Sequence, residues 1–181
     1  MNRPDDLASL DLQSLTELLV SRTPTVSELS SGQWLGVVEL MTMRLTDECG
    51  SLSVDSWRTC ASALEYALEA AVTSGAIDRR ESVIRRLNLA VVLLQRVPPN
   101  PEIEILNPSH LISLLFQELP MSVEEARDMS TDWRALDIVQ IRRLRAAKNL
   151  VSPALRLAKM MSGGNLDGRL EAWEEVFPSL P

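Results

Sequence analysis

The chain has 181 residues, of which 45% are hydrophobic, 24% charged and 4% aromatic, and its net charge is −7. This length suits one domain or two small subdomains, and the negative charge disfavours a general nucleic-acid-binding protein. The chain starts with polar residues and its longest apolar run is 89–94, so we expect neither a secretory signal nor a membrane span. Two cysteines without a framework spacing predict reduced thiols in a cytoplasmic protein.

Helix start and stop signals predict four helices in the first half of the chain. Leucines at helical spacing predict a helix over 10–21, and Pro24 ends the pattern. Ser30 or Ser31 can cap the second helix, and Ser53 can cap a third that ends at Gly75. The fourth, 77–97, has apolar residues at a seven-residue spacing and is apolar on most faces in its middle. It is therefore expected to be the central helix of a bundle.

Prolines separate this half from the next. Three prolines within 98–101 cannot continue a helix, so they predict a linker between an N-terminal helical bundle, 1–97, and a C-terminal helical subdomain, 98–181. The alternation of Glu and Ile over 102–105 suggests one short strand. The fold predicted for the whole chain is an all-α bundle of about eight helices, which can also form two packed subdomains.

Further start and stop signals delimit the helices of the second half. Asn107-Pro108 is a start signal, and Ser122 with Glu125 matches a capping box. A longer helix is expected over 132–150. Ser152-Pro153 predicts the start of another, which Gly163-Gly164 ends, and a last amphipathic helix ends at Pro178.

Helix 132–150 carries two stripes where one is expected. The first places apolar residues on one face as a core stripe: Trp133, Leu136, Val139, Leu144, Ala147, Leu150 and Val151. The second mixes isoleucines with cations: Arg134, Ile138, Ile141, Arg145 and Lys148. A surface helix has no need of a second apolar stripe, so the second stripe predicts a partner-binding face with an apolar centre and a charged rim. The alternative is that a neighbouring helix buries the isoleucines while the cations pair internally.

Charge is distributed in blocks along the chain. Residues 102–133 carry one basic and seven acidic side chains, whereas residues 134–161 carry seven basic and one acidic. The two blocks can neutralise each other in the folded chain, or the basic block can remain exposed for docking. Sixteen of the eighteen basic residues are Arg, a bias typical of GC-rich bacterial genomes.

The reactive side chains do not form a catalytic pattern, so no catalytic, cofactor-binding or metal-binding residue is assigned. His110 is the single histidine, and Cys49 and Cys60 do not have the spacing of zinc ligands. The acidic pairs 124–125 and 174–175 suit a helix's first turn and an exposed face better than acid–base catalysis. Residues 162–165 resemble a phosphate loop but lack its GxxxxGK[ST] frame.

Residues 40–97 show an order of features that resembles one known family. The segment runs Leu-Met-Thr-Met-Arg-Leu-Thr from residue 40, then Trp57, a Leu/Ala-rich helix to Gly75, and a Leu-rich helix that closes at Arg96. This order is similar to the small helical proteins associated with caspase-and-TPR-repeat conflict systems of actinobacteria. The family often has Gly-Asp where this chain has Gly75-Ala76, and residues 102–181 do not match it. The resemblance implies a non-enzymatic accessory of a defence or regulatory complex.

The sequence as a whole therefore predicts a non-enzymatic helical interaction or adaptor module. Its expected partner is a protein, either acidic or a second copy of the chain. One alternative is a transcription-related regulator that contacts nucleic acid through the basic segment 134–159, although no aromatic residues interleave there for base stacking. Another alternative is a small-ligand-dependent helical enzyme.

Overall fold

The computed structural model describes Leu7 and residues 9–22, 24–97, 102–161 and 168–176. These residues form eight α-helices and no strand, which confirms the predicted all-α class. The helices are α2 (Leu12–Val20), α3 (Ser31–Glu48), α4 (Val54–Thr73), α5 (Arg79–Leu94), α6 (Pro108–Glu118), α7 (Val123–Thr131), α8 (Ile138–Met161) and α9 (Gly168–Val176). No helix in this part of the chain is long and apolar enough to cross a membrane.

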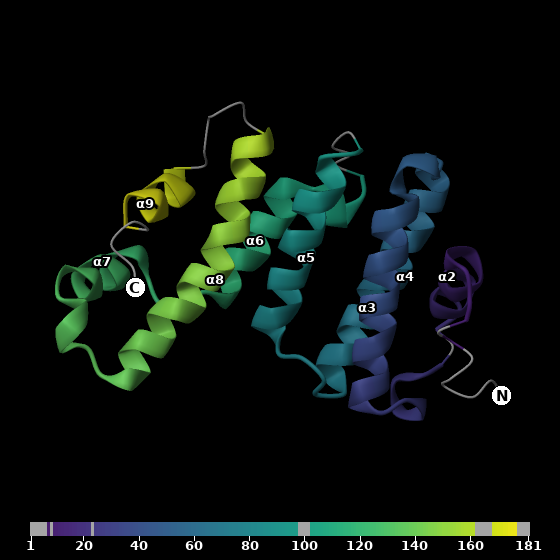
Figure 1. Ribbon diagram of the computed structural model, residues 1–181, viewed down its shortest axis with the longest axis horizontal. Helices are drawn as coiled ribbons and strands as arrows, with labels where there is room; N and C mark the ends of the chain where they lie inside the picture. The colour runs from purple at the N-terminus through teal and green to yellow at the C-terminus, as the bar shows by residue number, and fades with distance from the viewer. Residues whose placement is uncertain (1–6, 8, 23, 98–101, 162–167, 177–181) are drawn as a thin grey trace.

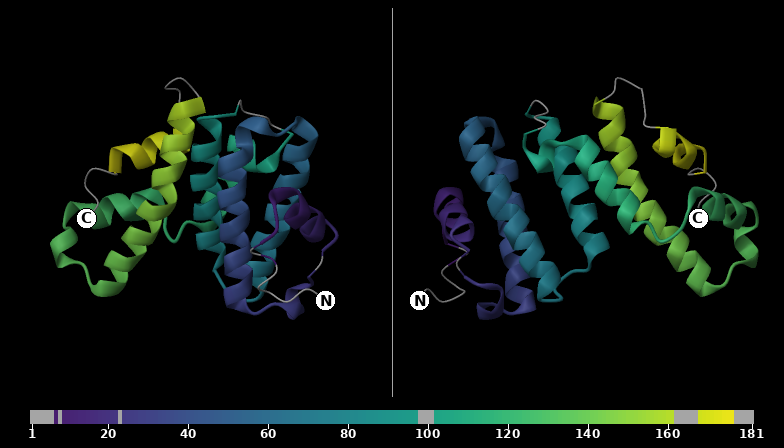
Figure 2. Two further views of the ribbon diagram at one scale, coloured as in Figure 1. Left: turned by 45° about the vertical axis from the view of Figure 1, so that its right-hand side comes forward. Right: turned by 180° about the vertical axis from the view of Figure 1, so that it is seen from behind.

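The helices follow one another along the long axis of the molecule in nearly their chain order. Figure 1 shows α2 at one end, then α3 and α4, then α5 with α6 and α8, and finally α7 and α9 at the other end. Both views in Figure 2 keep this order, so the first and last helices lie far apart.

Side-chain caps begin α4, α6 and α7 where the sequence predicts them. Ser53 Oγ accepts a hydrogen bond from the Ser56 amide at 3.2 Å, and Ser122 forms a reciprocal capping box with Glu125. Asn107 caps α6 with Pro108 in its first turn. After α4, Gly75 has φ of +74°, a conformation that a residue without a Cβ adopts freely. Local capping chemistry thus explains most of the helix boundaries.

Helix α5 contributes side chains to both hydrophobic cores of the molecule. Leu89 and Leu93 belong to the core formed by α2, α3 and α4, whereas Leu87 and Val91 belong to the core formed by α6, α8 and α9. Its expected central position is therefore observed. Ile103, which follows the proline segment, packs into the first core. The division into subdomains 1–97 and 98–181 stays a prediction, since residues 98–101 lie outside the described residues.

The prediction that Ser152-Pro153 starts a new helix is wrong. Helix α8 runs without interruption from Ile138 to Met161, with Pro153 inside it. A proline inside a helix removes one hydrogen bond and costs about 3 kcal/mol in isolation. Here Pro153 is itself buried, as are Val151 and Ala154 close to it, and this packing against α5 and α6 keeps the helix continuous.

The short strand expected over 102–105 is also not formed. Ile103 is extended, but Glu104–Leu106 form a turn of 3-10 helix, η3. Ile103 and Ile105 are both buried, so their burial rather than strand pairing accounts for the alternation. A strand without a partner would leave backbone groups unbonded. The expected stops at Gly163-Gly164 and Pro178 lie outside the described residues.

Candidate docking surface at the start of helix α8

Helix α8 begins six residues later than the sequence predicts. Residues Trp133–Ala135 form a separate 3-10 turn, η4, and Asp137 then caps α8. The Gln140 amide donates to Asp137 Oδ1 at 2.8 Å, while the Asp137 amide donates to Gln140 Oε1 at 2.9 Å. This reciprocal pair is a capping box, and its D-x-x-Q pattern was the signal in the sequence that could have placed the start. Arg134 is therefore not on α8 with the rest of the predicted stripe.

The burial of α8 changes along its length. From Leu144 onward, one side of the helix is buried against α5 and α6. In the first turn, Ile138 and Val139 are 60% and 59% exposed. The placement of Val139 in the core stripe was wrong, whereas Leu144, Ala147, Leu150 and Val151 are buried as predicted. Figure 1 shows the first turns of α8 extending beyond the ends of α5 and α6, which agrees with this exposure.

Two arginines follow the exposed isoleucine on the same face. Ile138, Arg142 and Arg145 are spaced at i, i+4 and i+7, which places them in one row along the helix. Arg142 and Arg145 are exposed and form no hydrogen bond or ion pair with any residue that the structure describes. Arg142 was missed by the sequence analysis, because the helix was assigned a different start and its second stripe was drawn through Arg134. We call Ile138, Val139, Arg142 and Arg145 the α8 docking face.

The other members of the predicted stripe lie differently. Ile141 and Lys148 are half-buried on the flank of this row. Arg134 and Lys148 each interact with other parts of the molecule. The structure thus brings four of the five predicted residues onto one helix, and of these Ile138 and Arg145 are exposed.

Several remaining cations of the basic block have intramolecular partners. Arg143 Nη2 donates to the Pro120 carbonyl at 2.9 Å and lies 3.4 Å from Glu125 Oε1, which joins the basic block to the acidic block before it. Lys159 pairs with Glu174 of α9. Arg156 Nη2 donates to Asn88 Oδ1 of α5 at 3.5 Å. Internal pairing therefore accounts for much of the basic charge, but not for that of Arg142 and Arg145.

The side chains that were considered for catalysis lie at helix starts or in the core. The amide of His110 donates to the Asn107 cap at 3.2 Å in the first turn of α6. Cys49 and Cys60 are buried free thiols. Hydrogen bonds from its own amide and from Ser122 lower the pKa of Glu124 at the start of α7. Within the described ranges, no three His, Cys, Asp or Glu side chains gather in a way that could hold a metal ion.

Comparison with known proteins gives no further guide to the site. No family model, curated protein or solved structure matches the chain. The function of the chain is therefore inferred from the chemistry of the α8 docking face.

Proposed function

We propose that this chain is a non-enzymatic helical interaction module that binds a protein partner through the α8 docking face. The observation that carries the proposal is the exposure of Ile138 and Val139 beside two arginines that have no partner among the residues the structure describes. These two aliphatic side chains are more than half exposed at the projecting end of the helix. A partner that covers them removes apolar surface from water, and this favours binding. The arginines supply the charged rim that protein interfaces usually have.

The charge of this face defines the chemistry of the partner. Arg142 and Arg145 favour a surface with carboxylates around an apolar contact, because Arg pairs well with carboxylates at interfaces. The resemblance of residues 40–97 to accessory proteins of bacterial conflict systems is compatible with a role in a defence or regulatory complex. The biological setting of the module is part of this proposal.

Affinity capture with a charge-reversed variant tests the proposal. The full-length chain and the variant Arg142→Glu/Arg145→Glu are immobilised, and proteins captured from the native host are quantified by mass spectrometry. A matched control, Arg79→Glu/Arg156→Glu, reverses two exposed arginines elsewhere; Arg156 lies about 27 Å along α8 from Ile138. We expect the docking-face variant to lose specific partners that the control retains, with the helical circular dichroism unchanged. Equal capture by both variants would contradict the proposal.

A gel shift at low salt separates this function from nucleic-acid binding. Because Arg143, Arg156 and Lys159 already contact Glu125, Asn88 and Glu174, we expect no shift of DNA or RNA by the wild-type chain. A shift that Arg142→Glu/Arg145→Glu abolishes would instead assign the face to nucleic acid and overturn the proposed function.

A further inference from the structure

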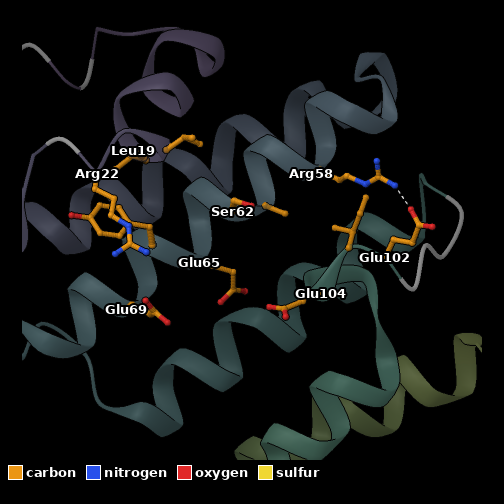
Figure 3. A pocket seen from close by; sticks show the side chains of 12 residues that line it. Leu19, Arg22, Arg58, Ser62, Glu65, Glu69, Glu102 and Glu104 are labelled. Atoms are coloured by element: carbon orange, nitrogen blue, oxygen red, sulfur yellow. Dashed lines mark hydrogen bonds and ion pairs between the residues drawn. The ribbon is translucent and has the colours of Figure 1, made fainter.

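A second surface with the opposite charge lies near the other end of the molecule. A pocket of about 500 Å³ opens between α2, α4 and the segment that leads into η3. Its apolar lining includes Leu19, Val20 and Ile103, and Val20 is 48% exposed at its edge. Figure 3 shows the carboxylates of Glu65 and Glu104 pointing into this space from α4 and η3, with Glu69 further along α4.

Two of the carboxylates at this pocket form no ion pair with any residue that the structure describes. Arg86 holds Glu65, and Arg58 pairs with Glu102 across the pocket edge. Arg22 lies over the Tyr66 ring, with its guanidinium carbon 5.7 Å from the ring centroid. Glu69 and Glu104 are exposed, and their side chains form no ion pair or hydrogen bond in the part of the chain described. The pocket therefore combines an exposed apolar edge with two glutamates that lack an ion-pair partner among the described residues, while Arg22 adds one positive charge to its lining.

The α8 docking face has the complementary composition. It presents two exposed aliphatic side chains next to two arginines, where the pocket presents an apolar lining and Val20 next to two glutamates. Pairing the two surfaces would bury apolar area on both sides and bring each arginine close to a carboxylate. One contact would thus pair the opposite charges and cover the exposed apolar side chains.

One molecule cannot join its own two surfaces. Figure 1 shows the start of α8 and the α2–α4 region toward opposite ends of the row of helices. The pairing must therefore occur between copies. Because the two surfaces differ, the contact is heterologous, and it leaves one free α8 docking face and one free pocket on every dimer. Further copies can add in the same way.

We propose that the partner of the α8 docking face is a second copy of this chain, which receives Ile138 and Val139 in the pocket beside Glu69 and Glu104. This inference rests on the proposed function and specifies its partner. The resulting assembly is head-to-tail, and its growth depends on protein concentration. Since its rim consists of exposed ion pairs, association weakens as salt increases.

Sedimentation velocity of the full-length chain over a range of concentrations tests the inference. We expect the wild type to form dimers and larger species, and both Arg142→Glu/Arg145→Glu and Glu69→Lys/Glu104→Lys to raise the dissociation constant at least about tenfold. An equimolar mixture of the two variants should still associate. The reversed α8 docking face of one variant attracts the reversed pocket of the other, and the two wild-type surfaces can also pair. The chain with all four substitutions should regain self-association, while Arg79→Glu/Arg156→Glu should associate like the wild type.

The outcomes distinguish this inference from the function on which it rests. A wild type that stays monomeric at every concentration overturns the self-association, while the capture experiment still tests the proposed function. Association that the α8 variant abolishes and the glutamate variant leaves intact also overturns the pairing with the pocket, since the α8 docking face would then bind elsewhere. Failure of the four-substitution chain to associate, with its helical circular dichroism intact, contradicts the charge pairing directly.

Discussion

Arg86 and Glu65 form an ion pair between α5 and α4 that is largely shielded from solvent. Their side chains are 12% and 25% exposed, and Arg86 Nε lies 3.0 Å from both carboxylate oxygens of Glu65. Arg86 also donates to the hydroxyl of Ser82, which is buried. A planar guanidinium meets all these acceptors at once, which an ammonium group cannot do. At the scale of single residues, this ion pair and its hydrogen bonds link α4 to α5.

Replacing Arg86 by Met should therefore lower the free energy of unfolding by about 1–3 kcal/mol, because Glu65 keeps its charge and loses its partner. Urea denaturation measures the change. The neighbouring Arg85 gives a matched control, since it pairs with Glu81 at the surface and its loss should cost about 0.5 kcal/mol or less. Equal effects of Arg85→Met and Arg86→Met would show that the shielding of the Glu65 pair has no energetic importance.

Cys60 makes stability depend on pH. Burial raises the pKa of its thiol, with Glu48 adding to the rise and the Thr16 hydroxyl opposing it. Because the folded pKa is above the unfolded one, the unfolded chain loses this proton first as pH increases. The contribution of Cys60 to stability is therefore complete below the unfolded pKa and is lost as pH rises through the folded pKa.

We expect the wild type to be more stable than Cys60→Ala near neutral pH, and the difference in unfolding free energy to narrow as the pH rises from neutral past the ordinary pKa of a thiol. Urea denaturation of both proteins across this range measures it. A difference that stays constant or widens with pH would contradict the assigned cause.

At the scale of elements, the start of α8 depends on its cap. Asp137 accepts from the Gln140 amide, and the resulting helix start places Ile138 at the exposed end. Asp137→Ala should lower stability by about 1 kcal/mol and increase hydrogen exchange in the first turn of α8. Asp128→Ala, an exposed aspartate within α7, is the control and should change little. Unchanged exchange at 138–142 in Asp137→Ala would mean that packing alone holds this turn.

The helix boundaries show which information the sequence carries. The boxes at Ser30 and Ser122 and the Asn107-Pro108 start depend on residues three or fewer positions apart, so the sequence alone predicts them. Ser152-Pro153 has the same local form but lies inside α8, because burial of Val151 and Ala154 outweighs it. That burial depends on α5, which is distant in the chain, and local patterns contain no measure of it.

The docking face illustrates the same limit. Periodicity identifies Ile138, Ile141 and Arg145 as neighbours on a helix, and the structure agrees. It also assigned Val139 to the core, since a helical pattern does not indicate where neighbouring helices end. The exposure of the first turn follows from the lengths and positions of α5 and α6. The pocket near η3 could not be predicted either, because it joins residues of α2, α4 and the 102–104 segment.

At the scale of the whole molecule, α5 should couple the two hydrophobic cores. Leu87 is fully buried in the core with α8, and Leu93 is fully buried in the core with α3 and α4. Leu87→Ala should cost about 2–5 kcal/mol, and hydrogen exchange should show lower protection in α3 and α4 as well as in α8. Leu93→Ala should have the reciprocal effect. Loss of protection confined to one core would instead support two subdomains that unfold independently.

Photo-crosslinking tests directly whether the α8 docking face binds a protein partner. A photoreactive amino acid replaces Ile138 in the full-length chain, and a control chain carries it at Met43, an apolar residue of α3 that is 51% exposed. Irradiation in the native host should produce specific protein adducts from position 138, including a second copy of the chain, and none of these from position 43. No adduct from position 138, or the same adducts from both positions, would contradict a docking role for the start of α8.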